Sequence, residues 1–209
     1  MYQPPHFREE RTEIQHALMR AHPLALLVTF GEGGLTANPV PLILHPERAD
    51  KGVLRGHLAR ANPQWRTFDR AVECLAVFQG ADAYITPSWY ATKRETGKVV
   101  PTWNYAIVQV YGRLAAIEDA NWLGEQVRSL TDRHEAAHPS PWAVADAPKE
   151  FVRAQLKGFV GIEIAISRIE AKWKVSQNRN AADRTGVAEG LLGEDDEAAR
   201  AMAALVTER

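Results

Sequence analysis

The sequence predicts a mainly β fold with peripheral helices, in the form of a small barrel, and three observations support this prediction. Six segments have the pattern of strands, and they follow one another without the regular strand–helix alternation of a doubly wound sheet. Amphipathic helical patterns occur at the ends of the chain and in one excursion. With 209 residues, 45% of them hydrophobic, the chain can form one domain with a substantial core.

The predicted strands are apolar and β-branched runs, or segments in which apolar and polar residues alternate. The clearest alternation covers residues 160–167, where every second residue is valine or isoleucine. In chain order the strands are residues 24–30, 35–44, 53–58, 72–79, 108–116 and 160–166. The second contains Pro39 and Pro41, which have no N–H to donate, so we expect it at a sheet edge or with a bulge.

Helices are predicted where apolar residues recur at helical spacing beside a capping or breaking residue. The predicted helices cover residues 8–21, the segment that Asp119 caps, residues 146–158, and the alanine-rich segment after the acidic residues 194–197. A further helix start is predicted at Asn62-Pro63, directly after a strand. Residues 83–105 are rich in Pro, Ser, Thr and aromatic residues, and are unusually long for an inert connection.

Composition limits the classes of partner and compartment. The 25 Lys and Arg residues against 26 Asp and Glu leave a net charge of -1, so no sequence-wide positive field exists to hold nucleic acid. The N-terminal segment has prolines and charges where a signal peptide needs an apolar stretch, and no run is long enough to cross a membrane. We expect a cytoplasmic protein without a membrane partner. Cys74, the only cysteine, lies in an apolar run and is expected to be buried.

The first segment that could carry chemistry is residues 54–63. Arg55, His57 and Arg60 precede Asn62-Pro63, where free backbone N–H groups at a helix start would attract an anion. Gly56 strengthens the interpretation, because a strand glycine often marks the close approach of a ligand or another backbone. The alternative is a capped surface helix with ordinary exposed arginines.

Two further segments combine aromatic and polar side chains. Residues 88–90 and 98–105 contain two tryptophans and two tyrosines among Thr, Asn and Lys, which could wall a planar heterocycle or simply belong to the core. Residues 172–179 surround one indole with three cations and could reach a phosphate, or form a solvated strand end. None of these segments contains an evident general base, so no catalytic residue is predicted.

One motif resembles a metal site. Residues 134–138, His-Glu-Ala-Ala-His, match the H-E-x-x-H pattern of zinc proteases. That chemistry needs both histidines on one face of a continuing helix, and Pro139 disfavours helical geometry at His138. We therefore predict a polar helix end and no bound metal. Nucleophile-elbow, P-loop and dinucleotide fingerprints are absent.

Five separated segments resemble, in the same order, the PaiB family, described as FMN-binding negative transcriptional regulators. The resemblance runs from Met1 to about Gly190 and rests on residues 1–2 with 5–7, 56–65 (GHLARANPQW), 84–90 (YITPSWY), 99–105 (VVPTWNY) and 172–179 (KWKVSQNR). One departure is Pro39, near which the family has a histidine.

The PaiB family is similar to the pyridoxamine-phosphate-oxidase-like split barrels, typically homodimers that bind FMN at the subunit interface. The resemblance implies one FMN-binding split-barrel domain over residues 1–190 and a helical tail over residues 191–209. It implies that Arg55, His57, Arg60 and Asn62 approach the phosphate and ribityl side, that Thr102, Trp103, Asn104 and Tyr105 line the flavin, and that Lys174, Gln177 and Arg179 close the site from the partner.

The resemblance implies a flavin-responsive regulator, although DNA binding is supported neither by charge nor by a helix-turn-helix with a basic second helix. An FMN-dependent oxidoreductase acting on a small molecule is the alternative, because the isoalloxazine itself performs redox chemistry. A third, weaker hypothesis is a haem protein in which His57 coordinates iron.

Overall fold

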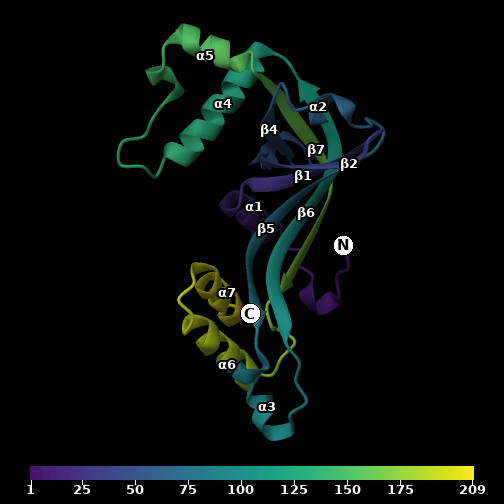
Figure 1. The fold of residues 1–209 in the computed structure, drawn as a ribbon, viewed down its shortest axis with the longest axis vertical. Coiled ribbons are helices and arrows are strands. Elements are labelled where there is room, and N and C mark those ends of the chain that lie inside the picture. The colour runs from purple at the N-terminus through teal and green to yellow at the C-terminus, as the bar shows by residue number, and fades with distance from the viewer. The chain divides into compact units, whose positions relative to one another are not determined.

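The computed structural model describes residues 1–209, and its strands form one seven-stranded sheet in the order β2-β1-β5-β6-β7-β4-β3 (Figure 1). The strands are β1 (Leu24–Gly31), β2 (Gly34–Pro41), β3 (Ile43–His45), β4 (Val53–Ala59), β5 (Cys74–Ile85), β6 (Thr102–Ile117) and β7 (Phe159–Lys174). β1 pairs antiparallel with β2 and β5, and β4 pairs antiparallel with β3 and β7. The mainly β prediction is confirmed.

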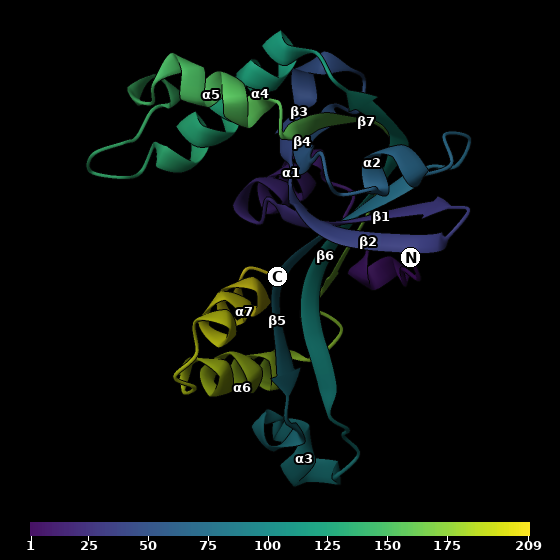
Figure 2. The ribbon, with the colours of Figure 1, turned by 45° about the horizontal axis from the view of Figure 1, so that its top comes forward.

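Helices lie before, between and after the strands in chain order (Figures 1 and 2). They are α1 (Thr12–Ala21), α2 (Gln64–Thr67), α3 (Ala91–Thr96), α4 (Ala120–Glu135), α5 (Lys149–Leu156), α6 (Ala181–Leu192) and α7 (Glu197–Thr207). Short 3-10 turns cover Pro5–Phe7, Pro46–Arg48, Pro87–Trp89 and Val144–Asp146. None of the helices has the length and apolar character needed to span a membrane.

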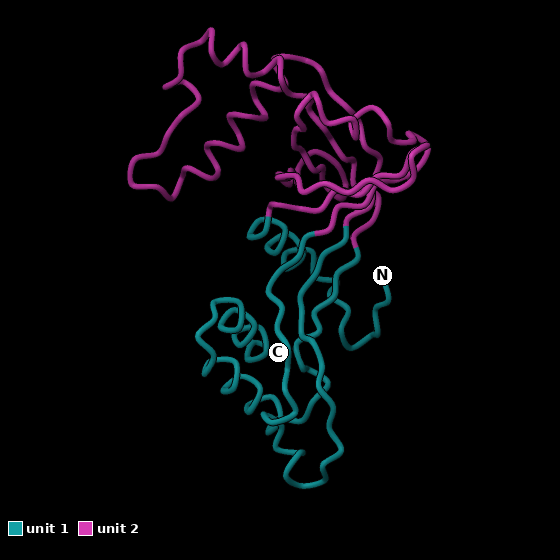
Figure 3. The backbone as a smooth tube through the Cα atoms, in the orientation of Figure 1, with its two compact units in different colours: residues 1–22, 78–109, 170–209 teal, residues 23–77, 110–169 magenta.

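The chain divides into two compact units (Figure 3). Unit 1 consists of residues 1–22, 78–109 and 170–209, and unit 2 of residues 23–77 and 110–169. Each unit has its own buried apolar side chains. Met19, Phe78, Tyr90, Leu191 and Met202 are buried in unit 1, and Leu27, Leu54, Leu123, Ile162 and Ile164 are buried in unit 2.

Within unit 2 the sheet curls so that β2 and β4, which are not neighbours in strand order, come into contact. A Cβ atom on Gly56 would lie 2.7 Å from the Pro41 carbonyl oxygen and 3.5 Å from Val40 Cγ1. Only glycine leaves room for this approach. Another backbone therefore explains the glycine that the sequence suggested as a mark of a ligand or a neighbouring strand.

The predicted strand over residues 35–44 is wrong in one respect, because it is two strands. β2 pairs with β1 as far as Pro41, whereas β3 pairs with β4. Between them the N–H of Leu42 donates to the carbonyl of Pro23 at 2.9 Å, which ends the hairpin register. The prediction that Pro39 and Pro41 lie on an edge strand is confirmed, since β2 stands at the end of the strand order.

Three other predicted boundaries differ from the structure. β5 extends to Ile85 and β6 begins at Thr102, so the two ends of the predicted connection over residues 83–105 are strand. The helix predicted from Asn62-Pro63 is the single turn α2. α6 was not predicted, because its two glycines and weak amphipathic pattern conceal it.

Candidate functional site

Arg55 lies on β4 and is bound within unit 2. Its Nε donates to Glu163 Oε2 at 2.7 Å, and its Nη2 lies 2.7 Å from the same oxygen. The guanidinium carbon also lies 5.0 Å from the centre of the Trp122 ring. The positive charge of Arg55 is thus compensated by a carboxylate on the neighbouring strand β7.

Arg60 follows β4 and has three partners in the same unit. Its Nη1 donates to Glu118 Oε2 at 2.5 Å, its Nε to the carbonyl of Lys157 at 3.0 Å, and its Nη2 to the carbonyl of Phe159 at 3.1 Å. These bonds tie the end of β4 to the segments around β7. A phosphate at Arg60 would share this guanidinium with existing partners.

The backbone around Asn62 is also hydrogen-bonded internally. The N–H of Arg60 donates to Gly158 at 2.7 Å and that of Asn62 to Ala59 at 2.9 Å, while Asn62 Oδ1 accepts from the N–H of Gln64 at 3.0 Å. The free N–H groups assumed from the sequence are therefore not found at these three positions. A helix of one turn also has little dipole to attract an anion.

His57 differs from the two arginines, because one of its ring nitrogens has no hydrogen-bond partner. Its Nδ1 is buried and forms no hydrogen bond, and its ring centre lies 4.8 Å from that of Phe159. Burial lowers the pKa of His57 below its ordinary value, so the imidazole is neutral at pH 7. A neutral ring can accept or donate one hydrogen bond at Nδ1, depending on its tautomer.

In unit 1, β6 and β7 bring together several residues that the sequence proposed. Lys174 Nζ donates to Thr102 Oγ1 and to the carbonyl of Trp103. Asn104 Nδ2 donates to Ser176 Oγ at 2.9 Å, and both side chains are buried. Ser176 has a positive φ of 64°, which is uncommon for a residue with a side chain and often marks a constrained functional turn.

A cluster of positive charge, Lys172, Lys174 and Arg179, lies around this turn. None of the three forms an ion pair with a carboxylate. Lys172 Nζ lies 5.2 Å from the Tyr105 ring centre, and the guanidinium carbon of Arg179 lies 4.6 Å from that of Tyr90. Burial, and then the charges of Lys172 and Arg179, lower the pKa of Lys174. We call these three residues the cationic cluster; they are the three cations of the segment 172–179, although Lys172 was not among the residues expected to close the site.

Exposed aromatic side chains lie on the same unit. Trp103 is 51% exposed and its Nε1 donates to Asp82 Oδ2 at 2.7 Å, while Tyr84 is 50% exposed with its ring 6.0 Å from that of Trp103. A small cavity of about 230 Å³ is lined by Gln79, Asp82, Trp103, Tyr105, Ala106 and Ile107. Asp82 was not singled out from the sequence, and Tyr84 was named only as part of the motif over residues 84–90, although the positions of both on β5 follow from extending the predicted strand 72–79.

Gln177 is directed towards its own loop. Its Oε1 accepts from the N–H of Val175 at 2.8 Å, and its Nε2 donates to the carbonyl of Trp173 at 2.5 Å. These bonds shape the turn that follows β7. Gln177 therefore supports the cationic cluster through the backbone.

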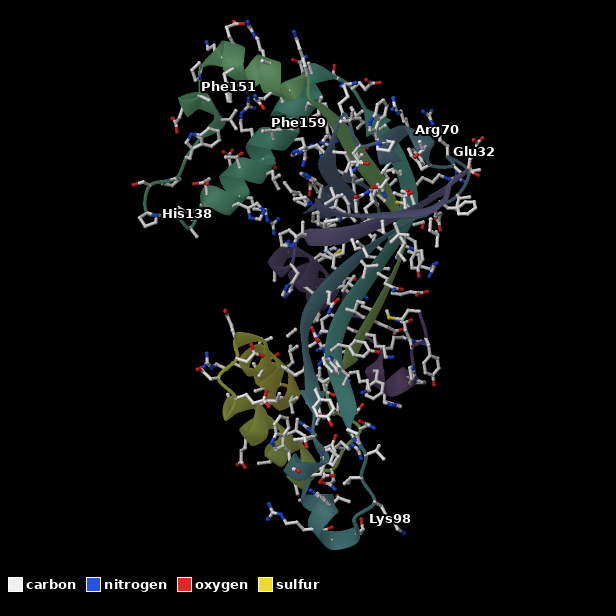
Figure 4. All side chains as sticks on the ribbon, viewed as in Figure 1. Glu32, Arg70, Lys98, His138, Phe151 and Phe159 are labelled. Carbon is white, nitrogen blue, oxygen red and sulfur yellow. The ribbon has the colours of Figure 1, made fainter.

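The histidine pair of the protease-like motif does not share a helix. α4 ends at Glu135, whose side chain accepts from the N–H of Trp142 at 2.9 Å, and His138 lies in the following loop (Figure 4). The geometry required of two zinc ligands on one helical face is therefore missing. No group of three or more His, Cys, Asp or Glu side chains is arranged to hold a metal.

Sequence comparison identifies the family. Residues 1–168 match the family described as "Putative FMN-binding domain". The chain is 33% identical to protease synthase and sporulation protein PAI 2 of Bacillus subtilis, covering 100% of this chain and 98% of that protein. It is 35% identical to an uncharacterized protein of Emericella nidulans, covering 96% and 94% of the two chains.

Solved structures show the same fold at low sequence identity. The flavocytochrome Anf3 from Azotobacter vinelandii aligns with a TM-score of 0.58 at 14% identity, covering 80% of this chain and 69% of that one. The FAD and heme binding protein from Mycobacterium smegmatis aligns with a TM-score of 0.55 at 15% identity, covering 79% and 71%. The fold is the flavin-binding split barrel, and the chain belongs to the PaiB family of FMN-binding proteins, with FMN as its cofactor.

Proposed function

We propose that the protein is a PaiB-type regulator that responds to FMN, acts as a homodimer and works in the cytoplasm. The observation that carries the proposed site is the cationic cluster, where three cations without a carboxylate partner lie beside exposed aromatic side chains in unit 1. Uncompensated positive charge attracts an anionic ligand, and exposed indole and phenol rings suit a planar one. FMN combines both properties.

The residues present fit FMN by the chemistry of their donors. Lys174 and Arg179 can donate to an electron-rich group of FMN, either the phosphate or the carbonyl edge of the ring. The indole of Trp103 can pack against the isoalloxazine, and Tyr105 adds a second aromatic side chain at this part of β6. When bound, FMN would supply redox chemistry, while the protein binds and orients it.

The β4 residues, in unit 2, are a separate candidate for FMN binding, on the strength of the family motif over residues 56–65. Arg55 and Arg60 already have internal partners, so their expected share of phosphate binding is smaller than their charge suggests. The unpartnered Nδ1 of His57 can bond a ribityl hydroxyl, and Asn62 retains its amide donors for the same purpose.

Parallel titrations with FMN and riboflavin test both groups of candidate residues, because riboflavin lacks the phosphate. Lys174→Ala is expected to weaken FMN binding about ten- to a hundredfold, since a charge-assisted hydrogen bond contributes roughly 1.5 to 3 kcal/mol. If riboflavin binding is unchanged, Lys174 meets the phosphate. If riboflavin weakens equally, Lys174 meets the ring edge.

Arg60→Ala is the contrasting variant, and Lys149→Ala is the control, because Lys149 is exposed at the start of α5 and lies outside the candidate segments. A selective loss of FMN in Arg60→Ala would place the phosphate at the end of β4. If Lys174→Ala binds both flavins with the affinity of the wild type, the cationic cluster does not bind FMN.

The oxidoreductase alternative is tested by adding reduced nicotinamide nucleotides to the FMN-loaded protein and following flavin absorbance. A regulator is expected to hold its flavin without sustained turnover in the presence of oxygen. Rapid, repeated oxidation of the nucleotide would favour an enzyme. A gel-shift assay of the same purified protein with the promoter region of its own gene shows whether regulation involves direct contact with DNA. The net charge of -1 argues against such contact.

A further inference from the structure

The side chain of Lys174 lies where the ends of two neighbouring strands meet in unit 1. β7 ends at Lys174 and β6 begins at Thr102, and the two strands are adjacent in the sheet (Figure 1). The amine of Lys174 donates to Thr102 Oγ1 and to the carbonyl oxygen of Trp103. Its nitrogen therefore has a defined position, set by regular strands, which most surface lysines lack.

The number of hydrogen-bond acceptors around Lys174 suits a neutral amine. A charged ammonium has three hydrogens to donate and gains most from a carboxylate, whereas a neutral amine has two hydrogens and one lone pair. The Thr102 hydroxyl and the Trp103 carbonyl accept two hydrogen bonds, and no carboxylate is among the charges that act on Lys174. In the neutral form both hydrogens are therefore satisfied, and the lone pair stays free.

The positive neighbours of Lys174 favour the neutral form further. Lys172 lies two residues away on the same face of β7, and Arg179 follows the turn at Ser176. Burial, followed by the charges of Lys172 and Arg179, lowers the pKa of Lys174 below its ordinary value. A lysine beside other cations reacts readily with carbonyl groups, because a larger fraction of its amine is neutral at pH 7.

We propose that Lys174 is a nucleophile that forms an imine with a small aldehyde or ketone carrying a carboxylate. The lone pair of Nζ attacks the carbonyl carbon, and the carbonyl oxygen takes up one amine hydrogen to give a carbinolamine. That oxygen then leaves as water with the second amine hydrogen, and the C=N bond forms. Water is the only other product, so the step consumes no oxidant or reductant.

The rest of the cationic cluster explains why the carbonyl compound carries a carboxylate. Lys172 and Arg179 lie beside aromatic rings and pair with no acidic side chain, so both can attract an anion. The Thr102 hydroxyl accepts from Lys174 and keeps its own hydrogen, which it can donate to the carbonyl oxygen. The inference goes beyond the proposed function and does not require FMN at the cluster, although FMN bound there would compete for Lys174.

Reductive trapping in the full-length protein tests the proposal. Glyoxylate, an aldehyde with a carboxylate, is added together with cyanoborohydride, which converts an imine into a stable secondary amine, and peptide mass spectrometry locates the product. Lys174 is expected to be modified at least about tenfold faster than Lys149, an exposed lysine at the start of α5. Equal modification of the two lysines, or no modification of Lys174, would overturn the proposal.

A variant of Arg179 tests the role of the carboxylate. Arg179→Ala is expected to slow the modification of Lys174 by glyoxylate about tenfold and to leave its modification by acetaldehyde, which has no carboxylate, nearly unchanged. Arg128→Ala, at an exposed position of α4, is the control and is expected to react as the wild type does. Circular dichroism checks that both variants fold. If Arg179→Ala reacts with glyoxylate as fast as the wild type, the cationic cluster does not select an anionic compound.

Trapping in the presence of FMN distinguishes this proposal from the proposed function. Fast modification of Lys174 that FMN slows supports both the imine and FMN at the cationic cluster. Fast modification that FMN leaves unchanged supports the imine and assigns FMN to other residues. FMN binding without fast modification of Lys174 overturns the imine alone.

Discussion

At the scale of single side chains, the two groups of candidate site residues differ in the partners of their positive charges. Arg55 and Arg60 satisfy their guanidinium groups with Glu163, Glu118 and backbone carbonyls. Lys174 donates only to a hydroxyl and a carbonyl, so its charge stays uncompensated. A new anion gains most where no carboxylate must first be displaced. For this reason Lys174, rather than Arg60, is the first residue to test.

Glu9 provides a prediction on acid stability. Its side chain is 2% exposed, with Arg11 and Arg209 as ion-pair partners. Burial alone would raise the pKa of Glu9, but hydrogen bonds from Arg11 and Arg209 hold it at about 2, below the ordinary value of 4.5. A carboxylate with a depressed pKa stabilises the folded state above pH 4.5, and this contribution is lost as the pH falls towards 2.

We expect Glu9→Gln to lower the free energy of unfolding by about 3 kcal/mol at pH 7, and the difference from wild type to shrink towards zero near pH 2. Urea unfolding monitored by circular dichroism across this range measures it. Glu10→Gln is the control, because Glu10 is 77% exposed and meets only Arg8 at 3.4 Å. A difference that does not depend on pH would contradict the depressed pKa.

At the scale of elements, α6 shows why a helix can be hard to find from sequence. Gly186 and Gly190 lower its helix propensity and interrupt its apolar pattern. The structure explains both glycines by contact with Trp89. A Cβ on Gly186 would lie 2.1 Å from the Trp89 carbonyl oxygen, and one on Gly190 would lie 2.3 Å from the indole ring. Asn180, whose side chain accepts from the N–H of Asp183, is the capping signal that could have located the helix.

The same contact predicts opposite effects for two glycine substitutions. Gly190→Ala should destabilise the protein by roughly 1 to 3 kcal/mol, because the added methyl overlaps the Trp89 ring. Gly124→Ala in α4 should stabilise it by about 0.5 to 1 kcal/mol, since its nearest neighbour would be Leu156 Cδ1 at 3.9 Å and alanine favours helix. Thermal unfolding of the two variants and of the wild type measures both changes in stability. Equal effects of the same sign would show that helix propensity, not the Trp89 contact, governs both positions.

At the scale of the whole molecule, cofactor binding and stability are linked. A ligand that binds only the folded protein stabilises it by about 2.7 kcal/mol at a hundredfold excess over its Kd. For a chain of 209 residues this corresponds to a rise in Tm of roughly 5 to 10 °C. FMN is therefore expected to raise the melting temperature in proportion to the logarithm of its concentration, measured by calorimetry.

Riboflavin provides the comparison for this experiment, since it should raise Tm less than FMN at equal concentration if the phosphate is bound. Repeating both titrations at two protein concentrations shows whether the dimer contributes, because the Tm of a dimer also depends on protein concentration. An unchanged Tm at saturating FMN would contradict FMN binding to the folded chain.

The amino-acid sequence by itself determined the class of fold, the family and the cofactor. Strand alternation and edge prolines are local signals, and the five motifs are preserved in order, so neither needs knowledge of distant contacts. Tertiary structure alone decided which site residues are already engaged. The sequence does not predict that Arg60 pairs with Glu118, or that Lys174 has no carboxylate partner. Such contacts depend on segments 58 or more residues apart. The burial of β1 is likewise a tertiary result. Nearly every residue of β1 is apolar, so only the structure shows which alternate side chains face the core and which are exposed.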